Sequence, residues 1–330
     1  MKILLIQTAF IGDVVLASPL IENLASSPSH HSIDFLLRSG NENLFENHPK
    51  LNKVIIWDKK KGKIVNLLKT IKTIRQSRYD IVINLHRFFS SGLISFFSGA
   101  AQKRGFKSNP FSFCYTLKIR HILDEKKHEV DRNLELIKDI VEIRTRRPVL
   151  YPTANDLGSV KRFKNKTYVC VAPASIWFTK QFPKEKWLEF IKTIKGKTIY
   201  LLGALTDNDL CEWLRIHSNS VEVNNLSGKL SFLESTALMR DATMNFVNDS
   251  APLHLASSVN APVTVIFCST IPAFGFGPLS DDSTIVETQE KLDCRPCGLH
   301  GFNKCPRGHF NCAKTIEIIQ LNTALAKGNK

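Results

Sequence analysis

One succession of short apolar runs and amphipathic segments occurs twice along this chain, and it restricts the fold more than any other feature. The run at 2–7 is apolar and leads through the loop 8–13 into apolar residues at helical spacing over 14–24. Strand, loop and helix in that order begin a βαβ unit of a parallel sheet. The succession starts again near residue 165. It therefore predicts an α/β chain with two Rossmann-like, doubly wound lobes.

The other elements follow from the same patterns. Short apolar runs predict further strands, at 32–37, 54–57, 79–85, 168–172, 198–202, 244–247 and 263–267. Apolar residues three or four apart predict helices, at 63–77, 184–195, 206–217 and 252–258. The polar segment 144–166 predicts a linker between domains at 1–160 and 161–330. The lobes are expected to face a central cleft, where the carboxyl ends of parallel strands bind ligands.

The net charge of +15 is concentrated in the N-terminal half. Residues 1–164 carry 28 Lys and Arg against 15 Asp and Glu, and residues 165–330 carry 17 against 15. This bias predicts an anionic partner, such as nucleic acid, a membrane surface or a phosphorylated saccharide, with simple solvation as the alternative. No apolar run reaches the roughly 20 residues of a membrane span, and Asp13 interrupts the run where a signal peptide would continue. A cytoplasmic protein is expected.

Polar residues follow the first predicted strand of each lobe. The sequence contains neither the glycine fingerprint of a dinucleotide-binding site nor that of a P-loop, so no motif supports either kind of site. Asp13 follows the strand at 2–7, and its structural alternative is to cap the next helix. Ser175, Thr179 and Lys180 lie in the loop after 168–172, where a lysine can neutralise phosphate.

A further polar segment follows the strand at 244–247. Asp249, Ser250 and His254 lie where a helix begins. The free backbone N–H groups of such a turn form an anion site that suits a diphosphate. A capped helix with a buried histidine is the alternative.

In this order, the segments resemble glycosyltransferase family 9, the heptosyltransferases of lipopolysaccharide core assembly, over most of the chain. The similar segments are 2–6, 12–19, 103–105, 128–132, 180–183, 203–207 and 249–254. The resemblance implies a GT-B fold and an inverting, metal-independent glycosyltransferase. The implied reaction moves heptose, or a related sugar, from ADP-heptose to the lipopolysaccharide inner core.

The resemblance also implies roles for residues. Asp13 is the implied general base. Donor-binding roles are implied for Ser175, Thr179, Lys180, Asp207, Asp249, Ser250 and His254. Acceptor-binding roles are implied for Lys60, Lys61, Arg104 and Arg132. The N-terminal domain is then expected to bind an anionic lipid-linked oligosaccharide (Kdo-lipid A or core) beside the inner membrane, the C-terminal domain to bind the nucleotide sugar, and catalysis to need no cofactor.

The chain departs from the family pattern at one position. Ala251 stands where the family has glycine after Asp-Ser. Its methyl group lies where the donor approaches, and alanine does not readily adopt a positive φ. The donor sugar is therefore left more open than the reaction class.

The segment 294–312 holds half of the eight cysteines. They are Cys294, Cys297, Cys305 and Cys312. A C-x-x-C pair in a reducing compartment favours a structural zinc site over disulfides, but the second pair lacks this spacing. A structural zinc and four unligated thiols both remain open.

Two other function classes fit parts of the sequence. A basic nucleic-acid-binding protein with a zinc ribbon would explain the charge and the cysteines. These features lie in opposite halves, however, and no nucleic-acid-binding motif accompanies them, so no nucleic-acid partner is expected. A nucleotide-sugar epimerase would need the missing glycine fingerprint.

Overall fold

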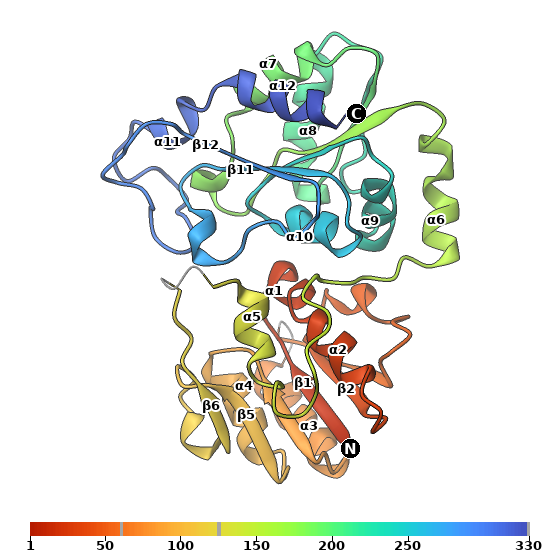
Figure 1. Ribbon diagram of the computed structural model, residues 1–330, viewed down its shortest axis with the longest axis vertical. Helices are drawn as coiled ribbons and strands as arrows, with labels where there is room; N and C mark the ends of the chain where they lie inside the picture. The colour runs from red at the N-terminus through yellow and green to blue at the C-terminus, as the bar shows by residue number, and fades with distance from the viewer. Residues whose placement is uncertain (60–61, 124–126, 329–330) are drawn as a thin grey trace. The chain divides into compact units, whose positions relative to one another are not determined.

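The computed structural model describes residues 1–59, 62–123 and 127–328. The chain forms two compact units, which we call unit 1 (Met1–Tyr151) and unit 2 (Pro152–Lys330). Each contains one six-stranded sheet in which neighbouring strands are parallel (Figure 1). The prediction of an α/β chain with two doubly wound sheets is confirmed.

Unit 1 has the strand order β3-β2-β1-β4-β5-β6. Its strands are β1 (Lys2–Ile6), β2 (Ser32–Arg38), β3 (Lys53–Trp57), β4 (Ile81–Asn84), β5 (Gln102–Phe106) and β6 (Leu117–Ile119). Its helices are α1 (Ile11–Val15), α2 (Ser18–Ala25), α3 (Lys63–Gln76), α4 (Phe89–Phe97) and α5 (Glu129–Leu134), with 3-10 turns η1 (Glu42–Leu44) and η2 (Ser112–Cys114). The central strands are buried, as their apolar runs predict.

The single helix predicted at 14–24 is wrong, because the chain forms α1 and α2 instead. Pro19 stands in the first turn of α2 and has no backbone N–H to donate to Val15, four residues earlier. The Ser18 hydroxyl donates to the Val15 carbonyl at 2.8 Å. The helical segment is therefore divided between Val15 and Ser18.

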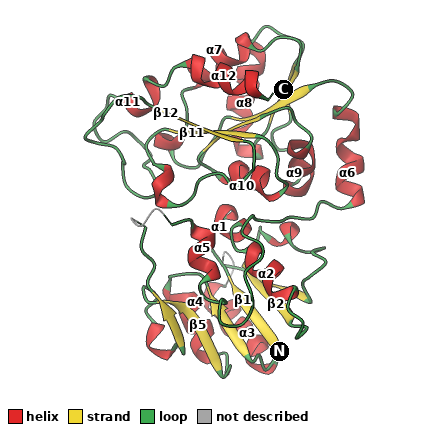
Figure 2. Cartoon of the chain, in the orientation of Figure 1, coloured by secondary structure: helices red, strands yellow, loops and turns green. Residues whose placement is uncertain are grey.

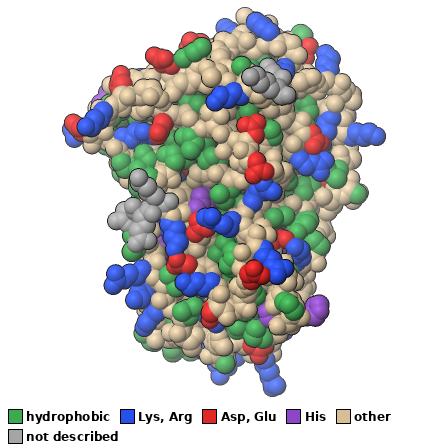
Figure 3. Space-filling view, in the orientation of Figure 1, with side chains coloured by type: hydrophobic (Ala, Val, Ile, Leu, Met, Phe, Trp, Pro, Cys, Tyr) green, Lys and Arg blue, Asp and Glu red, His purple; other side chains and the backbone are tan. Residues whose placement is uncertain are grey.

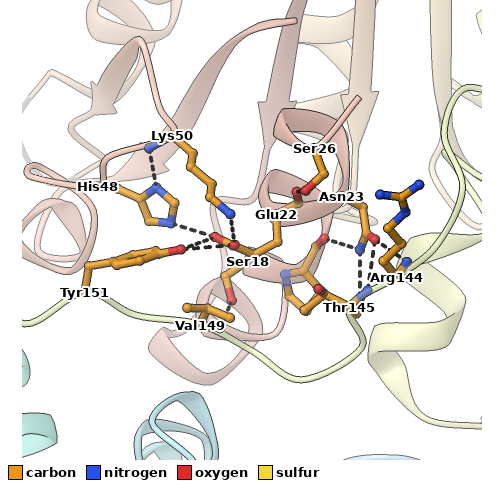
Figure 4. A network of polar contacts seen from close by, with 11 residues as sticks. Ser18, Glu22, Asn23, Ser26, His48, Lys50, Arg144, Thr145, Val149 and Tyr151 are labelled. Carbon is orange, nitrogen blue, oxygen red and sulfur yellow. Dashed lines mark hydrogen bonds and ion pairs between the residues drawn. The ribbon is translucent and has the colours of Figure 1, made fainter. Parts of the chain in front are cut away.

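The last segment of unit 1 returns along α2 (Figure 4). Backbone N–H groups of Arg144 and Thr145 donate to Asn23 Oδ1 at 2.7 and 3.0 Å. At the end of the unit, the Tyr151 hydroxyl donates to the Glu22 carboxylate at 3.0 Å, and Lys50 pairs with the same group. These contacts fix the chain to unit 1 up to its last residue.

Unit 2 repeats the topology, with the order β12-β11-β10-β7-β8-β9. Its strands are β7 (Tyr168–Ala172), β8 (Thr198–Leu201), β9 (Val223–Asn225), β10 (Asn245–Asn248), β11 (Val263–Phe267) and β12 (Ser283–Glu287). Its helices are α6 (Ala154–Val160), α7 (Lys184–Thr193), α8 (Asn208–His217), α9 (Phe232–Arg240), α10 (Ala251–Ser258), α11 (Asn311–Lys314) and α12 (Ile318–Lys327), with 3-10 turns η3 (Lys161–Phe163), η4 (Phe178–Lys180), η5 (Leu205–Asp207) and η6 (Pro272–Phe274). Figure 2 shows α7, α8 and α12 on one face of this sheet and α9 and α10 on the other.

The predicted linker at 144–166 is only partly irregular. It contains α6, which starts at a capping box between Thr153 and Asp156 and packs against α9. The division between the units falls before this helix, after Tyr151. Among the described residues, no helix is both long enough and apolar enough to cross a bilayer.

Candidate active site

Both sheets reverse their strand order at an equivalent place. In unit 1 the reversal lies between β1 and β4, and in unit 2 between β7 and β10. Ligands of doubly wound sheets bind at the carboxyl ends of the strands at this point, where adjacent loops diverge. The loops that contain Asp13, Lys180 and Asp249 follow β1, β7 and β10, so each predicted segment lies at such a position.

Asp13 lies in the first turn of α1 and is partly exposed. The N-cap of this helix is Phe10, whose side chain makes no capping bond. The alternative that Asp13 serves as the N-cap is therefore wrong. An acidic residue in a first turn still interacts favourably with the positive end of the helix dipole.

Cationic side chains that the sequence analysis did not single out gather around the loop after β1. Lys59 Nζ donates to the Thr8 carbonyl at 2.8 Å and to its hydroxyl at 3.2 Å. His86 Nδ1 lies 2.9 Å from the same hydroxyl. The Arg38 guanidinium lies 4.7 Å from the centre of the exposed Phe10 ring. Thr8 thus joins the ends of β1, β3 and β4 beneath a basic surface.

The pKa values in this basic group show how closely its charges are packed. Burial, and then the nearby Arg38 and Lys63, lower the pKa of Lys59 to about 8. Burial lowers the pKa of His86 to about 3, with Lys59 among the cations that add to the shift. His86 is therefore a neutral imidazole at physiological pH. An anion bound here would relieve the repulsion between the remaining cations.

The other basic residues predicted to bind acceptor are placed differently. The Arg104 guanidinium on β5 donates to the Leu136 carbonyl at 3.1 Å and pairs with Asp139. Arg132 is almost fully buried and pairs with Glu129 at 2.8 Å. The structure uses both guanidinium groups inside unit 1. Lys60 and Lys61 lie outside the described residues.

In unit 2, an ion pair joins the loops after β7 and β10. Lys180 Nζ lies 2.7 Å from Asp249 Oδ2, and the Thr270 hydroxyl donates to the same oxygen at 2.6 Å. Asn248 ties the same two loops, because its side chain accepts from the Phe182 N–H at 3.1 Å and donates to the Pro173 carbonyl at 2.7 Å. The pair is therefore held on a rigid support.

The helix that follows Asp249 presents its N-terminus at the end of β10. Ser250 is the N-cap of α10, and its side chain makes no capping hydrogen bond. His254 is buried one turn into the helix. Ala251 is the first helical residue and is not among the residues with positive φ. The expected backbone difficulty with alanine is therefore wrong, since the chain does not need a positive φ there, while the effect of the methyl group on the donor stays a prediction.

Two further residues predicted to bind the donor, Asp207 and Ser175, make hydrogen bonds that hold their loops in place. Asp207 Oδ2 accepts from the Ala204 N–H at 2.8 Å at the start of η5. The approach is so close that a Cβ on Gly203 would lie 2.9 Å from this oxygen. The Ser175 carbonyl accepts from the Gln181 amide at 2.6 Å. These contacts shape the loops after β8 and β7.

The cysteine-bearing segment packs against the lysine loop, a relationship that the sequence did not reveal. Thr179 is buried, and its hydroxyl accepts from the Phe302 N–H at 2.7 Å. Its own N–H donates to the Phe302 carbonyl at 3.1 Å. Gly301 has φ +79°, and a Cβ there would lie 3.1 Å from Lys180 Cγ. The segment thus forms one wall behind Lys180.

The predicted zinc ligands do not form a metal site among the described residues. All eight cysteines are free, and no group of three or more His, Cys, Asp or Glu side chains there is arranged to hold a metal ion. Cys294 Sγ lies 3.8 Å from His309 Nε2. Burial raises the pKa of Cys312 to about 11, and the neighbouring Cys305, Cys294 and Cys297 add to the shift. The side chains as placed do not fit a zinc ion.

A family model and the curated relatives of this chain point to the same family. The model of glycosyltransferase family 9 (heptosyltransferase) matches residues 67–299. Lipooligosaccharide heptosyltransferase 2 of Haemophilus influenzae is 25% identical over 313 residues, which cover 88% of this chain and 89% of that protein.

Solved structures share the fold over the whole chain. E. coli ADP-heptose lps heptosyltransferase II has a TM-score of 0.78 at 19% identity, with 100% of both chains covered. The iron-containing dodecameric glycosyltransferase TibC from enterotoxigenic E. coli has a TM-score of 0.61 at 16% identity, covering 99% of this chain and 76% of that one. The predicted GT-B fold class is confirmed.

Proposed function

The chain belongs to glycosyltransferase family 9, the heptosyltransferase family, and we propose from this premise that it transfers heptose from ADP-heptose to the inner core of lipopolysaccharide. As a member of this family it is a glycosyltransferase. One observation carries the proposal: each unit has, at the reversal point of its sheet, one half of the chemistry that glycosyl transfer needs. Unit 1 has a carboxylate beside cations, and unit 2 has a lysine beside a helix N-terminus.

The donor diphosphate is assigned to unit 2. The N-terminus of α10 offers the Ala251 N–H and the positive end of the helix dipole, whereas Pro252 has no N–H and that of Leu253 donates to the Ser250 carbonyl at 3.0 Å. Lys180 supplies a full charge, and its pairing with Asp249 holds the ammonium group in place before donor binds. Together these groups stabilise the negative charge of the leaving ADP, so the proposed reaction needs no metal. Ser175, Asp207, Ser250 and His254 are proposed to complete the nucleotide-sugar site.

The base is assigned to Asp13. Its carboxylate takes the proton of the acceptor hydroxyl as that oxygen attacks the anomeric carbon. The bond from this carbon to the diphosphate breaks on the opposite face, and ADP leaves with the electron pair. The configuration at the anomeric carbon is therefore inverted.

The acceptor is assigned to the basic side of unit 1. Arg38 and Lys59 lie around the loop that leads to Asp13 and suit the phosphates or acidic sugars of Kdo-lipid A or core. We propose these two residues in place of Arg104 and Arg132, whose guanidinium groups are used in ion pairs within the unit. Such an acceptor would place the enzyme in the cytoplasm, at the inner membrane.

The base assignment is tested with Asp13→Asn and a matched control, Glu46→Gln, which removes an exposed carboxylate from the same unit. Loss of a positioned base should lower kcat for heptose transfer by about 10²–10⁴-fold while leaving ADP-heptose affinity unchanged. Glu46→Gln should retain wild-type kcat. Full activity of Asp13→Asn would overturn the assignment, whatever the donor.

The donor sugar is the less constrained part of the proposal. A different sugar nucleotide within the same family is the second candidate, because Ala251 adds a methyl group at the start of α10. Calorimetric titration with ADP-heptose and with UDP- and GDP-sugars separates the two candidates. Binding of ADP-heptose alone supports the proposal, and preference for another nucleotide contradicts it.

A further inference from the structure

An aromatic cluster lies on the surface of unit 1 and contains none of the residues assigned above. It consists of Phe89, Phe96, Phe97, Phe111 and Phe113, from α4 and the loop around η2. The ring centre of Phe96 lies 4.9 Å from that of Phe97, 5.7 Å from that of Phe111 and 5.9 Å from that of Phe113. Phe89 joins the group through Phe111 at 5.1 Å. The cluster is therefore one continuous patch.

Four of the five side chains of this aromatic cluster are exposed to solvent, and Phe111 is half-buried. The exposed fractions are 60% for Phe89, 39% for Phe96, 43% for Phe97 and 67% for Phe113. Continuous apolar surface of this kind is rare on a protein that meets only water, and it marks a place where another apolar surface binds. Single exposed apolar residues elsewhere need no such explanation.

The surroundings of the aromatic cluster are strongly basic. The segment 59–123, which contains the cluster, carries 14 Lys and Arg against a single acidic residue, Asp80. The Arg75 side chain donates to the Phe97 carbonyl at 3.4 Å, and the exposed Lys107 precedes the loop that contains Phe111 and Phe113. Lysine and arginine side chains gather along the edge of unit 1 where β5 and β6 lie (Figure 3). Exposed aromatic rings thus have a cationic border.

We propose that the aromatic cluster docks unit 1 on an anionic lipid bilayer. Aromatic side chains favour the boundary between headgroups and acyl chains, and lysine and arginine at the rim attract anionic headgroups. A second copy of the chain would bring two basic rims together, which repel each other. Nucleic acid would need flat ring faces for stacking, whereas these rings pack on each other at tilted and edge-on angles.

The docking surface adjoins the acceptor side of the unit. Phe88 precedes α4, and its ring centre lies 4.7 Å from that of His86, which contacts Thr8 in the basic group described above. The surface thus extends from the proposed acceptor site along α4. This inference rests on the proposed function only for the identity of the acceptor, since lipid binding needs neither donor nor acceptor.

The test is sedimentation of the full chain with vesicles of neutral phosphatidylcholine, alone or with phosphatidylglycerol. Wild type should bind the anionic vesicles, and high salt should release it. Phe97→Ser/Phe113→Ser should lower the bound fraction at least about 10-fold with unchanged thermal unfolding. The matched control, Val221→Ser/Ile319→Ser, removes two exposed apolar side chains from unit 2 and should bind as wild type does.

Three results would overturn the inference. They are absence of wild-type binding to anionic vesicles, equal binding by the phenylalanine variant, and salt-sensitive binding of an RNA or DNA oligonucleotide in place of vesicles. Transfer to an acceptor freed of its acyl chains separates this inference from the proposed function. The phenylalanine variant should retain that activity, so loss of docking and loss of catalysis are measured independently.

Discussion

Lys180 Nζ and Asp249 Oδ2 lie 2.7 Å apart, although the two residues follow different strands and are far apart in the sequence. Both side chains are mostly buried, with 16% and 7% exposed. The lysine is therefore held in place before any ligand binds. Its contribution to binding a diphosphate requires little further ordering, which lowers the entropic cost of binding.

Removal of Lys180 should affect both binding and stability. Lys180→Met leaves the Asp249 carboxylate buried beside the Thr270 hydroxyl but without its cation, which should cost about 1–3 kcal/mol in the free energy of unfolding. Affinity for ADP should fall at least about 10-fold by calorimetry. Lys195→Met, at an exposed position of unit 2, is the matched control. Unchanged ADP affinity in Lys180→Met would remove this lysine from the donor site.

Gly301 should be sensitive to substitution because the cysteine-bearing segment supports Lys180. In Gly301→Ala, the new Cβ would lie 2.9 Å from Thr179 Oγ1 and 3.1 Å from Lys180 Cγ, so the lysine loop must shift. Gly308→Ala is the control, since Gly308 has nearly the same φ, +77°, and open space at its Cβ. We expect ADP affinity to fall about 10-fold in the first variant only. An equal loss of ADP affinity in both variants would show that backbone strain alone causes it, and that the contact between Gly301 and Lys180 has no effect.

Acceptor binding should weaken in alkali. The pKa of Lys59, lowered to about 8 by burial and then by Arg38 and Lys63, means that the ammonium form predominates below pH 8 and disappears above it. A bound anion favours the charged form, so the loss is centred at or above pH 8. Lys59→Arg should retain affinity for a phosphorylated acceptor up to pH 9.5, as fluorescence titration can measure. A wild-type affinity that does not change from pH 7 to 9.5 contradicts this role.

Buried His48 should make unit 1 sensitive to acid. Burial and then the nearby Lys50 lower the pKa of His48 to about 4, below its unfolded value, so the folded state binds this proton less readily. Stability is thus fully present above about pH 6.5 and is lost as the pH falls toward 4. His48→Phe should reduce this loss in the free energy of unfolding by about 2–3 kcal/mol, as urea titrations at pH 7 and pH 4 can measure. The exposed His217→Phe is the control, and an identical pH profile for His48→Phe would refute the assignment.

The sequence predicts the central strands well and the outer strands poorly. β1, β4, β7 and β10 are buried on both faces, so they read as apolar runs. The strands that were not predicted include β5, with the sequence Gln-Lys-Arg-Gly-Phe, and the short edge strands β6 and β9. Their pairing depends on neighbouring strands, which a local pattern does not contain.

The candidate site was predictable where it follows a strand end. The segments of Asp13, Lys180 and Asp249 were found because they follow strands that are recognisable. Arg38, the last residue of β2, and Lys59, just after β3, meet the same criterion and could have been found by it. The contact between Phe302 and Thr179 could not have been found in this way, because it joins segments more than 100 residues apart and no sequence motif marks it.

The most direct test of the proposed reaction is to incubate the purified chain with ADP-heptose and Kdo-lipid A and to follow the products by mass spectrometry and NMR. We expect release of ADP together with an acceptor that carries one heptose, inverted at its anomeric carbon. We also expect the product to be lost in Asp13→Asn while ADP-heptose still binds. Transfer from another sugar nucleotide, or retention of the anomeric configuration, would contradict the proposed reaction.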